Sequence, residues 1–409
     1  MDVRLADFIR DTPDGEEAQA ILRKCVHCGF CTATCPTYQL LGDELDGPRG
    51  RIYLIKEMLA GAEATTVTQA HLDRCLTCRA CETTCPSGVE YGRLLDIGRK
   101  VADARIGRPP GQRLLRWALR RTMADRRVFS ALLGAGRALR GLLPRALAAV
   151  IAPRRSAGAW PAPLHARRML VLDGCVQPAL APRINAAAAR VLDRLGISLL
   201  RAPQAGCCGA LSQHLHAQDE ALGFARRNID AWWPLLEQGV EAIVMTASGC
   251  GVMVKDYGQL LRHDEAYAAK AARVSATTKD LAEILAAEGA SLAQVAGAPR
   301  VAFQCPCTLQ HGQKLGGVVE SLLLRAGCEL TPVADAHLCC GSAGTYSLLQ
   351  PELSQRLRDD KLRALQAGQP ELIATANIGC LNHLQAQSEV PVLHWIELLD
   401  DGAVGAQLP

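Results

Sequence analysis

The sequence predicts a multidomain protein in which an α-helical N-terminal domain precedes two repeated α/β cysteine-rich units. Three observations support this fold class. Two runs of four cysteines, each closed by proline, lie within the first 90 residues, a strongly basic segment follows, and the second half repeats one cysteine spacing. The chain has 409 residues, 49% of them hydrophobic, which is enough apolar material for two or three domains.

Changes in composition divide the chain into four predicted segments. Residues 1–104 contain both proline-closed runs, and 105–164 form an arginine-rich linker bounded by prolines. Residues 165–290 and 298–409 hold the two cysteine-rich copies. No stretch reaches the roughly 18 apolar residues of a membrane-spanning helix, so an integral membrane protein is not expected.

The two runs read "CVHCGFCTATCP" at 25–36 and "CLTCRACETTCP" at 75–86. Two-residue gaps let three thiolates wrap one [4Fe–4S] cube, while the fourth cysteine, before proline, serves the other cube in two-cluster ferredoxins. The spacing therefore predicts a small ferredoxin-like domain with two [4Fe–4S] clusters. The first cluster is assigned to Cys25, Cys28, Cys31 and Cys85, and the second to Cys75, Cys78, Cys81 and Cys35.

Zinc and disulfides are the alternatives for these cysteines. Zinc sites favour paired CxxC units rather than a triplet with an outlying CP. Disulfides require export, but the acidic N-terminus has no apolar signal core, so a cytoplasmic location is expected. His27 and His71 lie near the clusters without filling a ligand position, and solvated or capping roles are expected for them. The helix after "DGPRGR" (46–51) should bury one face, made of Ile52, Ile55, Met58 and Leu59.

The second half repeats its cysteines at offsets of 132, 132 and 130 residues. The first copy has Cys175, Cys207, Cys208 and Cys250, and the second has Cys307, Cys339, Cys340 and Cys380. Apolar runs at 168–173, 241–247, 300–303 and 371–376 predict buried strands, and the stretches 183–195, 216–231, 314–326 and 352–366 predict helices. This alternation predicts two α/β units with mainly parallel sheets, whose cysteines gather at the strand ends.

Three interpretations of these repeated cysteines stay open at this point. One or both sets could hold a further iron–sulfur cluster, serve a structural or zinc-binding role, or belong to a fold without a cluster. Cys305 is a candidate fifth ligand in the second copy, but a buried packing role is expected for it and for Cys328. His311 and His383 could orient or ligate a cluster, although hydrogen-bonded structural histidines are commoner.

The segment from Arg105 to Arg155 contains 13 arginines and one acid, Asp125, although the whole chain carries only +4. Leucines and Trp117 recur among the arginines of 113–143 at helical spacing, which predicts one basic amphipathic helix. Contact with anionic lipid or with a partner subunit is the expected role, and a solvated linker is the alternative. Nucleic-acid binding is not expected, because aromatic residues make up only 4% and no binding motif is present.

Together, the two proline-closed runs and the two CCG units resemble the iron–sulfur subunit family of bacterial glycolate oxidase. The stretches "CPCTLQHGQKLGG" (305–317), "HLCCGSAGTYSL" (337–348) and "TANIGCLNHL" (375–384) are especially similar to that family. The resemblance covers nearly the whole chain. It implies a subunit that carries electrons from FAD-binding partner subunits, which oxidise glycolate, toward membrane quinone. The expected chain therefore lies in the cytoplasm or on the inner face of the membrane.

The absence of a dinucleotide fingerprint fits that division of labour, since "GAGRALRG" (134–141) has the wrong glycine spacing. No catalytic residue is expected on this chain. The alternatives are a disulfide or heterodisulfide reductase subunit, an electron-transfer subunit of a lactate or glycerol-3-phosphate dehydrogenase, and a metal-dependent scaffold. Similar CCG units in heterodisulfide reductases end in CxxC, but Met253 and His383 occupy that final position here, which argues against the reductase.

Overall fold

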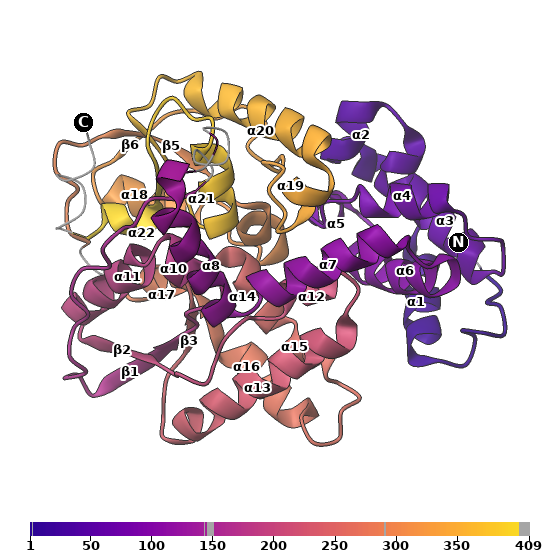
Figure 1. Cartoon of the computed structure of the whole chain (residues 1–409), viewed down its shortest axis with the longest axis horizontal. Helices are drawn as coiled ribbons and strands as arrows, with labels where there is room; N and C mark the ends of the chain where they lie inside the picture. Colours follow the sequence, from indigo (N-terminus) through magenta and orange to yellow (C-terminus); the bar gives the residue numbers. More distant parts are fainter. Residues whose placement is uncertain (2, 143, 145–150, 290–291, 401–409) are drawn as a thin grey trace. The chain divides into compact units, whose positions relative to one another are not determined.

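The computed structural model describes residues 1, 3–142, 144, 151–289 and 292–400 (Figure 1). Residues 143, 145–150, 290–291 and 401–409 of the predicted linker and cysteine-rich units lie outside the described residues. The chain divides into two compact units. The first comprises residues 1–115 and 335–361, and the second comprises 116–334 and 362–409. The expected fold class, a helical domain followed by two small parallel α/β units, is confirmed, whereas the four segment boundaries stay a prediction.

Short helices carry the two cysteine runs of the first unit. They are α1 (Pro13–Lys24), η1 (Phe30–Thr32), α2 (Pro36–Leu41), η2 (Glu44–Asp46), α3 (Pro48–Leu59), α4 (Thr66–Asp73), α5 (Ala80–Thr84) and α6 (Tyr91–Ile106). Proline begins α1, α2 and α3, where its fixed φ suits a first helical turn and its missing N–H costs nothing. The proline that closes the first run therefore starts α2 directly after Cys35.

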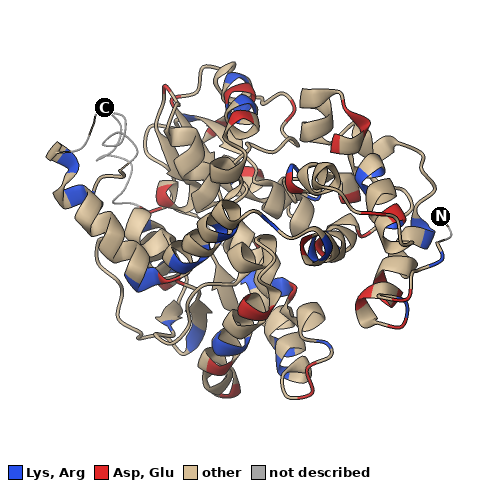
Figure 2. Cartoon of the chain, turned by 45° about the vertical axis from the view of Figure 1, so that its right-hand side comes forward, with Lys and Arg blue, Asp and Glu red and all other residues tan. Residues whose placement is uncertain are grey.

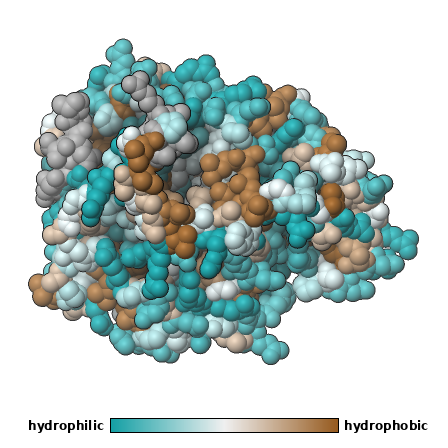
Figure 3. Space-filling view, viewed as in Figure 1, coloured by the Kyte–Doolittle hydropathy of each residue, from teal (hydrophilic) through white to brown (hydrophobic). Residues whose placement is uncertain are grey.

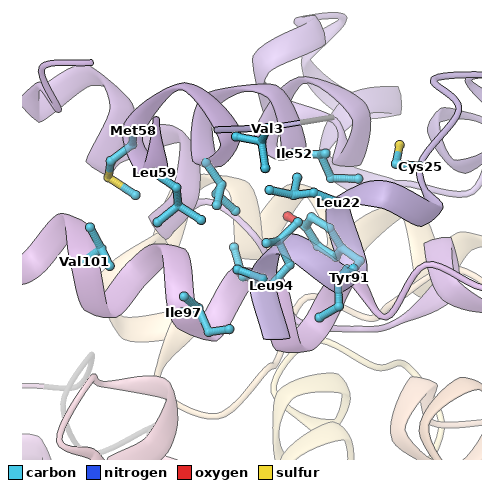
Figure 4. Close-up of a cluster of buried hydrophobic side chains, with 14 of the residues drawn as sticks. Val3, Leu22, Cys25, Ile52, Met58, Leu59, Tyr91, Leu94, Ile97 and Val101 are labelled. Atoms are coloured by element: carbon cyan, nitrogen blue, oxygen red, sulfur yellow. The ribbon is translucent and has the colours of Figure 1, made fainter. Parts of the chain in front are cut away.

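An apolar core joins α1, α3 and α6 beneath the cysteine loops. Figure 4 shows Leu22, Ile52, Leu59 and Leu94 pointing toward one another in this core. The predicted buried face of α3 is confirmed, since all four of its apolar residues are buried. The cysteine loops thus rest on a rigid base of packed side chains.

The basic segment forms two helices, α7 (Pro110–Met123) and α8 (Arg126–Ala138), followed by the short turn η3 (Arg140–Leu142). The prediction of one continuous helix over 113–143 was therefore wrong. The reason is Asp125, whose carboxylate accepts hydrogen bonds from the backbone N–H groups of Arg127 and Val128 and caps the start of α8.

The first cysteine-rich unit contains a four-stranded parallel sheet of order β2-β1-β3-β4. Its strands are β1 (Arg167–Val171), β2 (Ile197–Arg201), β3 (Ile243–Met245) and β4 (Thr278–Asp280). Its helices are α10 (Gln177–Leu180), α11 (Arg183–Arg194), α12 (Ala210–His214), α13 (Gln218–Glu237), α14 (Ser248–Lys255), α15 (Tyr257–Leu260), α16 (Ala268–Thr277) and α17 (Leu281–Ala287).

The second cysteine-rich unit repeats this topology with the order β6-β5-β7-β8, again entirely parallel. Its strands are β5 (Arg300–Gln304), β6 (Glu329–Leu330), β7 (Leu372–Thr375) and β8 (Val392–His394). Its helices are η4 (Thr308–Gly312, a π-helical turn), α18 (Val318–Arg325), α19 (Tyr346–Leu349), α20 (Pro351–Gln366), α21 (Ile378–Gln385) and α22 (Trp395–Leu398). The four predicted strands and four predicted helices are confirmed, whereas β2, β4, β6 and β8 were not predicted.

Candidate metal centres

The two N-terminal cysteine loops share one unusual backbone conformation. In the first loop His27 and Gly29 have φ of 57° and 87°, and in the second loop Thr77 and Arg79 have φ of 53° and 60°. Three of these four residues are not glycine, and positive φ is strained for such residues and concentrates at functional sites. The repeated conformation wraps three successive cysteines around one point in each loop.

A first cavity collects sulfurs from both loops. Its lining includes all four cysteines assigned to the first cluster, namely Cys25, Cys28, Cys31 and Cys85. Burial raises the pKa of Cys31 to about 11, and the charge of Cys25 adds to this effect. Cys28 is exposed at the surface of the first unit. The structure thus brings Cys85, from the second run, to the three cysteines of the first.

A second cavity shows the reverse exchange. It is lined by Cys75, Cys78 and Cys81 together with Cys35 from the first run. Cys81 also lines the first cavity, so its side chain forms part of the wall between the two. Burial raises the pKa of the Cys81 thiol, which is the behaviour of a sulfur that needs a metal to stay ionised. Five cysteines line the first cavity and four line the second, with Cys81 common to both, which is enough for the four thiolates that each of two [4Fe–4S] clusters needs.

A buried polar network, not foreseen from the sequence, adjoins the second cavity. The Arg51 guanidinium lines it and donates to Asp46 Oδ1 at 3.3 Å. Arg74 donates to the other Asp46 oxygen at 2.9 Å, and His71 Nδ1 lies 3.0 Å from Oδ1. His71 is therefore a buried partner of a carboxylate, and the expectation of a solvated or capping histidine was wrong. The "DGPRGR" stretch contains both Asp46 and Arg51. Two opposite charges at the start of an apolar helix were the only sequence signal that could have indicated this buried ion pair.

In the first cysteine-rich unit, four cysteines converge from three strand ends. Cys175 follows β1, Cys207 and Cys208 follow β2, and Cys250 lies in the first turn of α14 after β3. Because these strands are parallel neighbours, their carboxyl ends meet at one edge of the sheet. The four free thiols form a continuous chain of hydrogen bonds, from Cys175 to Cys207, from Cys207 to Cys208 and from Cys208 to Cys250.

The pKa values within this group diverge. Hydrogen bonds from the Cys175 and Cys208 thiols lower the pKa of Cys207, and the Gly209 N–H, 3.4 Å from its sulfur, acts in the same direction. Hydrogen bonding to Cys207 and burial raise the pKa of Cys175, and similar effects act on Cys208. Four buried or half-buried thiols in a chain of contacts, one of them with a lowered pKa, suit a metal or cluster.

Two side chains that sequence reasoning missed hold the Cys207–Cys208 turn. Asn228, from α13, donates to the carbonyl oxygen of Cys207 at 2.9 Å, and its own oxygen accepts from the Gly206 N–H at 2.8 Å. The Tyr257 hydroxyl donates to the carbonyl oxygen of Cys208 at 2.8 Å. Both are buried polar residues within helical segments, a pattern that a single sequence does not distinguish from a solvated polar face. Met253, in the position of the missing cysteine, packs in the apolar core.

The second cysteine-rich unit repeats the local geometry of the Cys-Cys-Gly turn. The Gly341 N–H donates to Cys339 Sγ at 3.4 Å, with a φ of 86° against 91° at Gly209. Cys380 Sγ accepts from Asn377 Nδ2 at 3.5 Å. Cys339 and Cys340 belong to the first compact unit, whereas Cys307 and Cys380 belong to the second. Cys305 and Cys328 are buried, as their expected packing role requires.

Within the first compact unit, Tyr346 connects the Cys339–Cys340 segment to the second cavity. Its hydroxyl donates to the carbonyl oxygen of Arg74 at 3.2 Å, immediately before Cys75. Burial raises the pKa of Tyr346, and the negative charges of Cys75 and Cys339 add to the shift.

Comparison with known proteins agrees with this arrangement. Residues 21–89 match the family described as a 4Fe-4S dicluster domain, and 169–255 and 301–385 match the cysteine-rich CCG domain. The chain is 56% identical over 402 residues to the glycolate oxidase iron-sulfur subunit of Escherichia coli (strain K12), covering 98% of both chains. The chain belongs to the glycolate oxidase iron–sulfur subunit family. This membership confirms the resemblance on which the sequence interpretation rested, and the dicluster domain supports the expected [4Fe–4S] clusters.

Two further relatives define the breadth of the glycolate oxidase subunit family. A probable glycolate oxidase iron-sulfur subunit of Bacillus subtilis (strain 168) is 30% identical, with 93% of this chain and 94% of the relative covered. Lactate utilization protein A of Bacillus licheniformis is 26% identical but matches only 55% of this chain, although that match covers 96% of the relative. The lactate alternative is therefore less well supported than glycolate. Among the described residues, no helix is both long and apolar enough to cross a membrane.

Proposed function

We propose that this chain is the electron-transfer subunit of a glycolate oxidase complex, and that it passes electrons from a partner's FAD toward quinone. The carrying observation is the crossed arrangement of eight cysteines in two cavities that share Cys81. An iron–sulfur cube carries one electron, whereas a reduced flavin releases two, so two neighbouring cubes suit an exchange with flavin. Oxidation of the substrate itself is assigned to the partner subunits.

The cavity linings support the ligand sets that the cysteine spacing predicts. We assign Cys25, Cys28, Cys31 and Cys85 to the first cluster, and Cys75, Cys78, Cys81 and Cys35 to the second. Clusters in these cavities would supply one-electron redox chemistry. The chain's own residues hold the sulfurs in place through the two left-handed loops and the core beneath them.

A further cluster is proposed for Cys175, Cys207, Cys208 and Cys250. The observation that favours it is the continuous contact of these four thiols at the carboxyl edge of the first sheet. By the internal repeat, Cys307, Cys339, Cys340 and Cys380 form the corresponding candidate set. Repetition of the Gly341-to-Cys339 hydrogen bond supports the same use of both Cys-Cys-Gly turns.

The first cavity is the proposed contact point for the flavin-bearing partner. Cys28 is exposed there, and the apolar side chains of Val26 and Phe30 beside it are 68% and 60% exposed. Electron transfer needs close approach of a partner, and exposed apolar residues around an exposed ligand favour such an interface. The second cavity includes two largely buried sulfurs, Cys35 and Cys81.

The basic helices are the proposed contact with the anionic inner face of the membrane. Leu132, Leu139 and Leu142 of α8 and its C-terminal continuation are exposed, and arginines recur in the same segment. Figure 3 shows hydrophobic patches on this face of the molecule, and Figure 2 shows basic side chains spread over the helices. Each basic residue near an anionic surface contributes about 1 kcal/mol. Some arginines are already engaged, since Arg137 donates to the backbone oxygens of Ala152, Pro153 and Ala179. Sedimentation with vesicles containing phosphatidylglycerol tests this contact, and equal binding to neutral vesicles would contradict it.

Anaerobic reduction with glycolate tests the proposed function. The complex containing this chain and its flavoprotein partners is mixed with glycolate, and cluster signals are followed by EPR. Glycolate should reduce the clusters only when the flavoproteins are present. Reduction by D-lactate or glycerol 3-phosphate but not glycolate would overturn the substrate assignment. Turnover of a small disulfide by the chain alone would instead favour the reductase alternative.

A further inference from the structure

Two buried arginines contact residues of the second ligand set: Arg51 lines the cavity, and Arg99 hydrogen bonds to the backbone of Cys75. The Arg51 side chain is 1% exposed and donates to the carbonyl oxygen of His71 at 2.7 Å and to Thr37 Oγ1 at 3.1 Å, in addition to Asp46. Its guanidinium lines the cavity together with Cys35 and Cys75. Arg51 is therefore a fixed positive charge beside the sulfurs.

Arg99 supplies the second charge. This residue of α6 is 6% exposed and donates to the carbonyl oxygen of Leu72 at 2.7 Å and to that of Cys75 at 2.8 Å. Its hydrogen-bond partners are backbone carbonyls, and it forms no ion pair with a carboxylate among the described residues. The guanidinium is thus anchored to the backbone of a cluster ligand while keeping its full charge.

Hydroxyl groups approach the sulfurs of the same set. The Tyr91 hydroxyl donates to Cys75 Sγ at 3.7 Å, and Thr37 Oγ1 lies 3.3 Å from Cys35 Sγ. The Thr77 N–H also donates to Cys75 Sγ at 3.4 Å. Hydrogen bonds to the sulfurs and nearby positive charge both favour the reduced, more negative form of a cluster.

The first cavity has a different electrostatic setting. Its arginine, Arg49, is 38% exposed and lies 2.6 Å from the carboxylate of Glu44. Solvent screens this charge and Glu44 offsets it. Among the described residues, the side-chain contacts that Thr37 and Tyr91 make with sulfur have no counterpart at Cys25, Cys28, Cys31 or Cys85.

The charge of the site makes this difference consequential. A cube in its 2+ state with four thiolates carries about −2, and one added electron makes it about −3. A buried cation acts through a low effective dielectric and stabilises the added charge more than an exposed cation does. Asp46 opposes Arg51, but Asp46 also pairs with Arg74, so the network of these three residues keeps a net positive charge.

We propose that Arg51 and Arg99 raise the reduction potential of the second cluster above that of the first, which makes the second cluster the electron acceptor within the dicluster domain. This inference rests on the proposed ligand sets. With clusters bound, an electron that entered at the exposed first cavity would move to the second, and the first site could then accept the next electron from the two-electron donor.

Anaerobic potentiometric titration, read by EPR, tests the inference. The second cluster is identified in a Cys28→Ser background that lacks the first, and the first is then assigned by difference. The unsubstituted protein should show the higher potential at the second cluster. Arg99→Met should lower that potential by about 59 mV, equivalent to a tenfold change in a one-electron equilibrium, and leave the first cluster unmoved.

Variants of opposite sign separate electrostatics from loosening of the structure. Arg51→Gln removes a positive charge and should lower the potential of the second cluster, whereas Asp46→Asn removes a negative charge and should raise it. Arg49→Gln is the matched control, an exposed arginine two residues away, and should change either potential by less than a third as much. The inference is overturned if Arg51→Gln and Asp46→Asn shift the potential of the second cluster in the same direction. It is also overturned if the second cluster of the unsubstituted protein has a lower potential than the first.

Iron analysis of each variant accompanies the titration. If Arg51→Gln loses iron, Tyr91→Phe still tests the inference, because it removes only a hydroxyl that reaches Cys75 and should lower the potential by a smaller amount. A chain without a second four-iron site would contradict the proposed function itself. If both clusters are present but substitutions of Arg51, Arg99 and Asp46 leave their reduction potentials unchanged, this inference is contradicted and the proposed function is not.

Discussion

The dicluster domain and the first cysteine-rich unit assemble four sulfurs by different means. In the dicluster domain, three ligands of each set come from seven consecutive residues, and only the fourth comes from a distant loop. In the cysteine-rich unit, ligands that span Cys175 to Cys250 meet only because three parallel strands end at one edge. The first arrangement depends on local backbone conformation, and the second depends on the whole sheet. Substitutions should therefore affect the two regions differently.

The largest expected effect is at Cys81, which lines both cavities of the dicluster domain. Cys81→Ser should abolish the EPR signal of the second cluster and also disturb that of the first. Cys28→Ser, at the exposed edge, should remove the first alone. Neither should alter a cluster at Cys207 and Cys208. An unchanged first-cluster signal in Cys81→Ser would show that Cys81 does not contribute to both sites.

The Cys-Cys-Gly turn should be the most sensitive backbone position of the first sheet. Gly209 has a φ of 91°, and a Cβ there would lie 3.0 Å from the carbonyl oxygen of Ala221. Gly209→Ala should cost about 3 kcal/mol, since both strain and a backbone clash oppose it. Gly196→Ala is the control, because Gly196 also has positive φ but open space around it, and about 1 kcal/mol is expected. Urea unfolding measures the loss of unfolding free energy in both variants. Equal losses would show that the contact with the Ala221 carbonyl oxygen does not contribute.

Acid should weaken the sheet-dependent region through His394. Burial lowers the pKa of His394 to about 4, while its Nε2 hydrogen bonds to the carbonyl oxygen of Thr246 at 2.8 Å. The unfolded chain takes up this proton near pH 6.5 but the folded chain only near pH 4, so stability falls as pH decreases through that window. The loss reaches about 3 kcal/mol at pH 4.

The His394→Asn variant checks this pH dependence. The difference in unfolding free energy between the variant and the unsubstituted protein should change in the variant's favour from pH 7 to pH 4.5. His263→Asn, at an exposed histidine, serves as the control and should leave the slope unchanged. A pH-independent difference for His394→Asn would show that this histidine is not buried in its neutral form.

The smallest expected effect is at Tyr346, which joins the Cys339–Cys340 segment to the dicluster domain. Tyr346→Phe removes the hydrogen bond to the Arg74 carbonyl oxygen, which contributes about 1 kcal/mol. Hydrogen exchange of residues 335–361 should therefore quicken about fivefold, whereas Tyr53→Phe, at a half-exposed tyrosine, should change nothing. Unchanged exchange in Tyr346→Phe would mean that the segment is held by its other contacts alone.

Local spacing explains which features could be predicted from the sequence. The crossed expectation for Cys35 and Cys85 came from the CxxCxxCxxxCP pattern, since that pattern restricts where each sulfur can point. The strands β1, β3, β5 and β7 were recognisable as apolar runs. Two of the missed edge strands had no such signal, because β4 reads Thr-Lys-Asp and β6 has only two residues.

Long-range polar contacts could not be predicted. Nothing local distinguishes Arg99 from the exposed arginines of the same region, because its burial depends on how α6 packs against the loop that ends at Cys75. The same holds for Asn228 and Tyr257, which reach the Cys207–Cys208 turn from distant helices. Tertiary packing also decides that residues 335–361 group with residues 1–115 rather than with the sheet of the second cysteine-rich unit, and no local pattern indicates this.

The central claim is that the cysteines at the edge of the first sheet form a metal site, as the cysteines of the N-terminal loops do. Measurement of iron and acid-labile sulfide per chain, in protein purified without oxygen, tests this claim. The unsubstituted chain should contain about 12 irons or more, from the dicluster domain and at least one cysteine-rich unit. The Cys207→Ser, Cys208→Ser double variant should lose about four of them while the dicluster EPR signals persist. About eight irons in both proteins would contradict the claim and restrict the metal to the N-terminal cysteines.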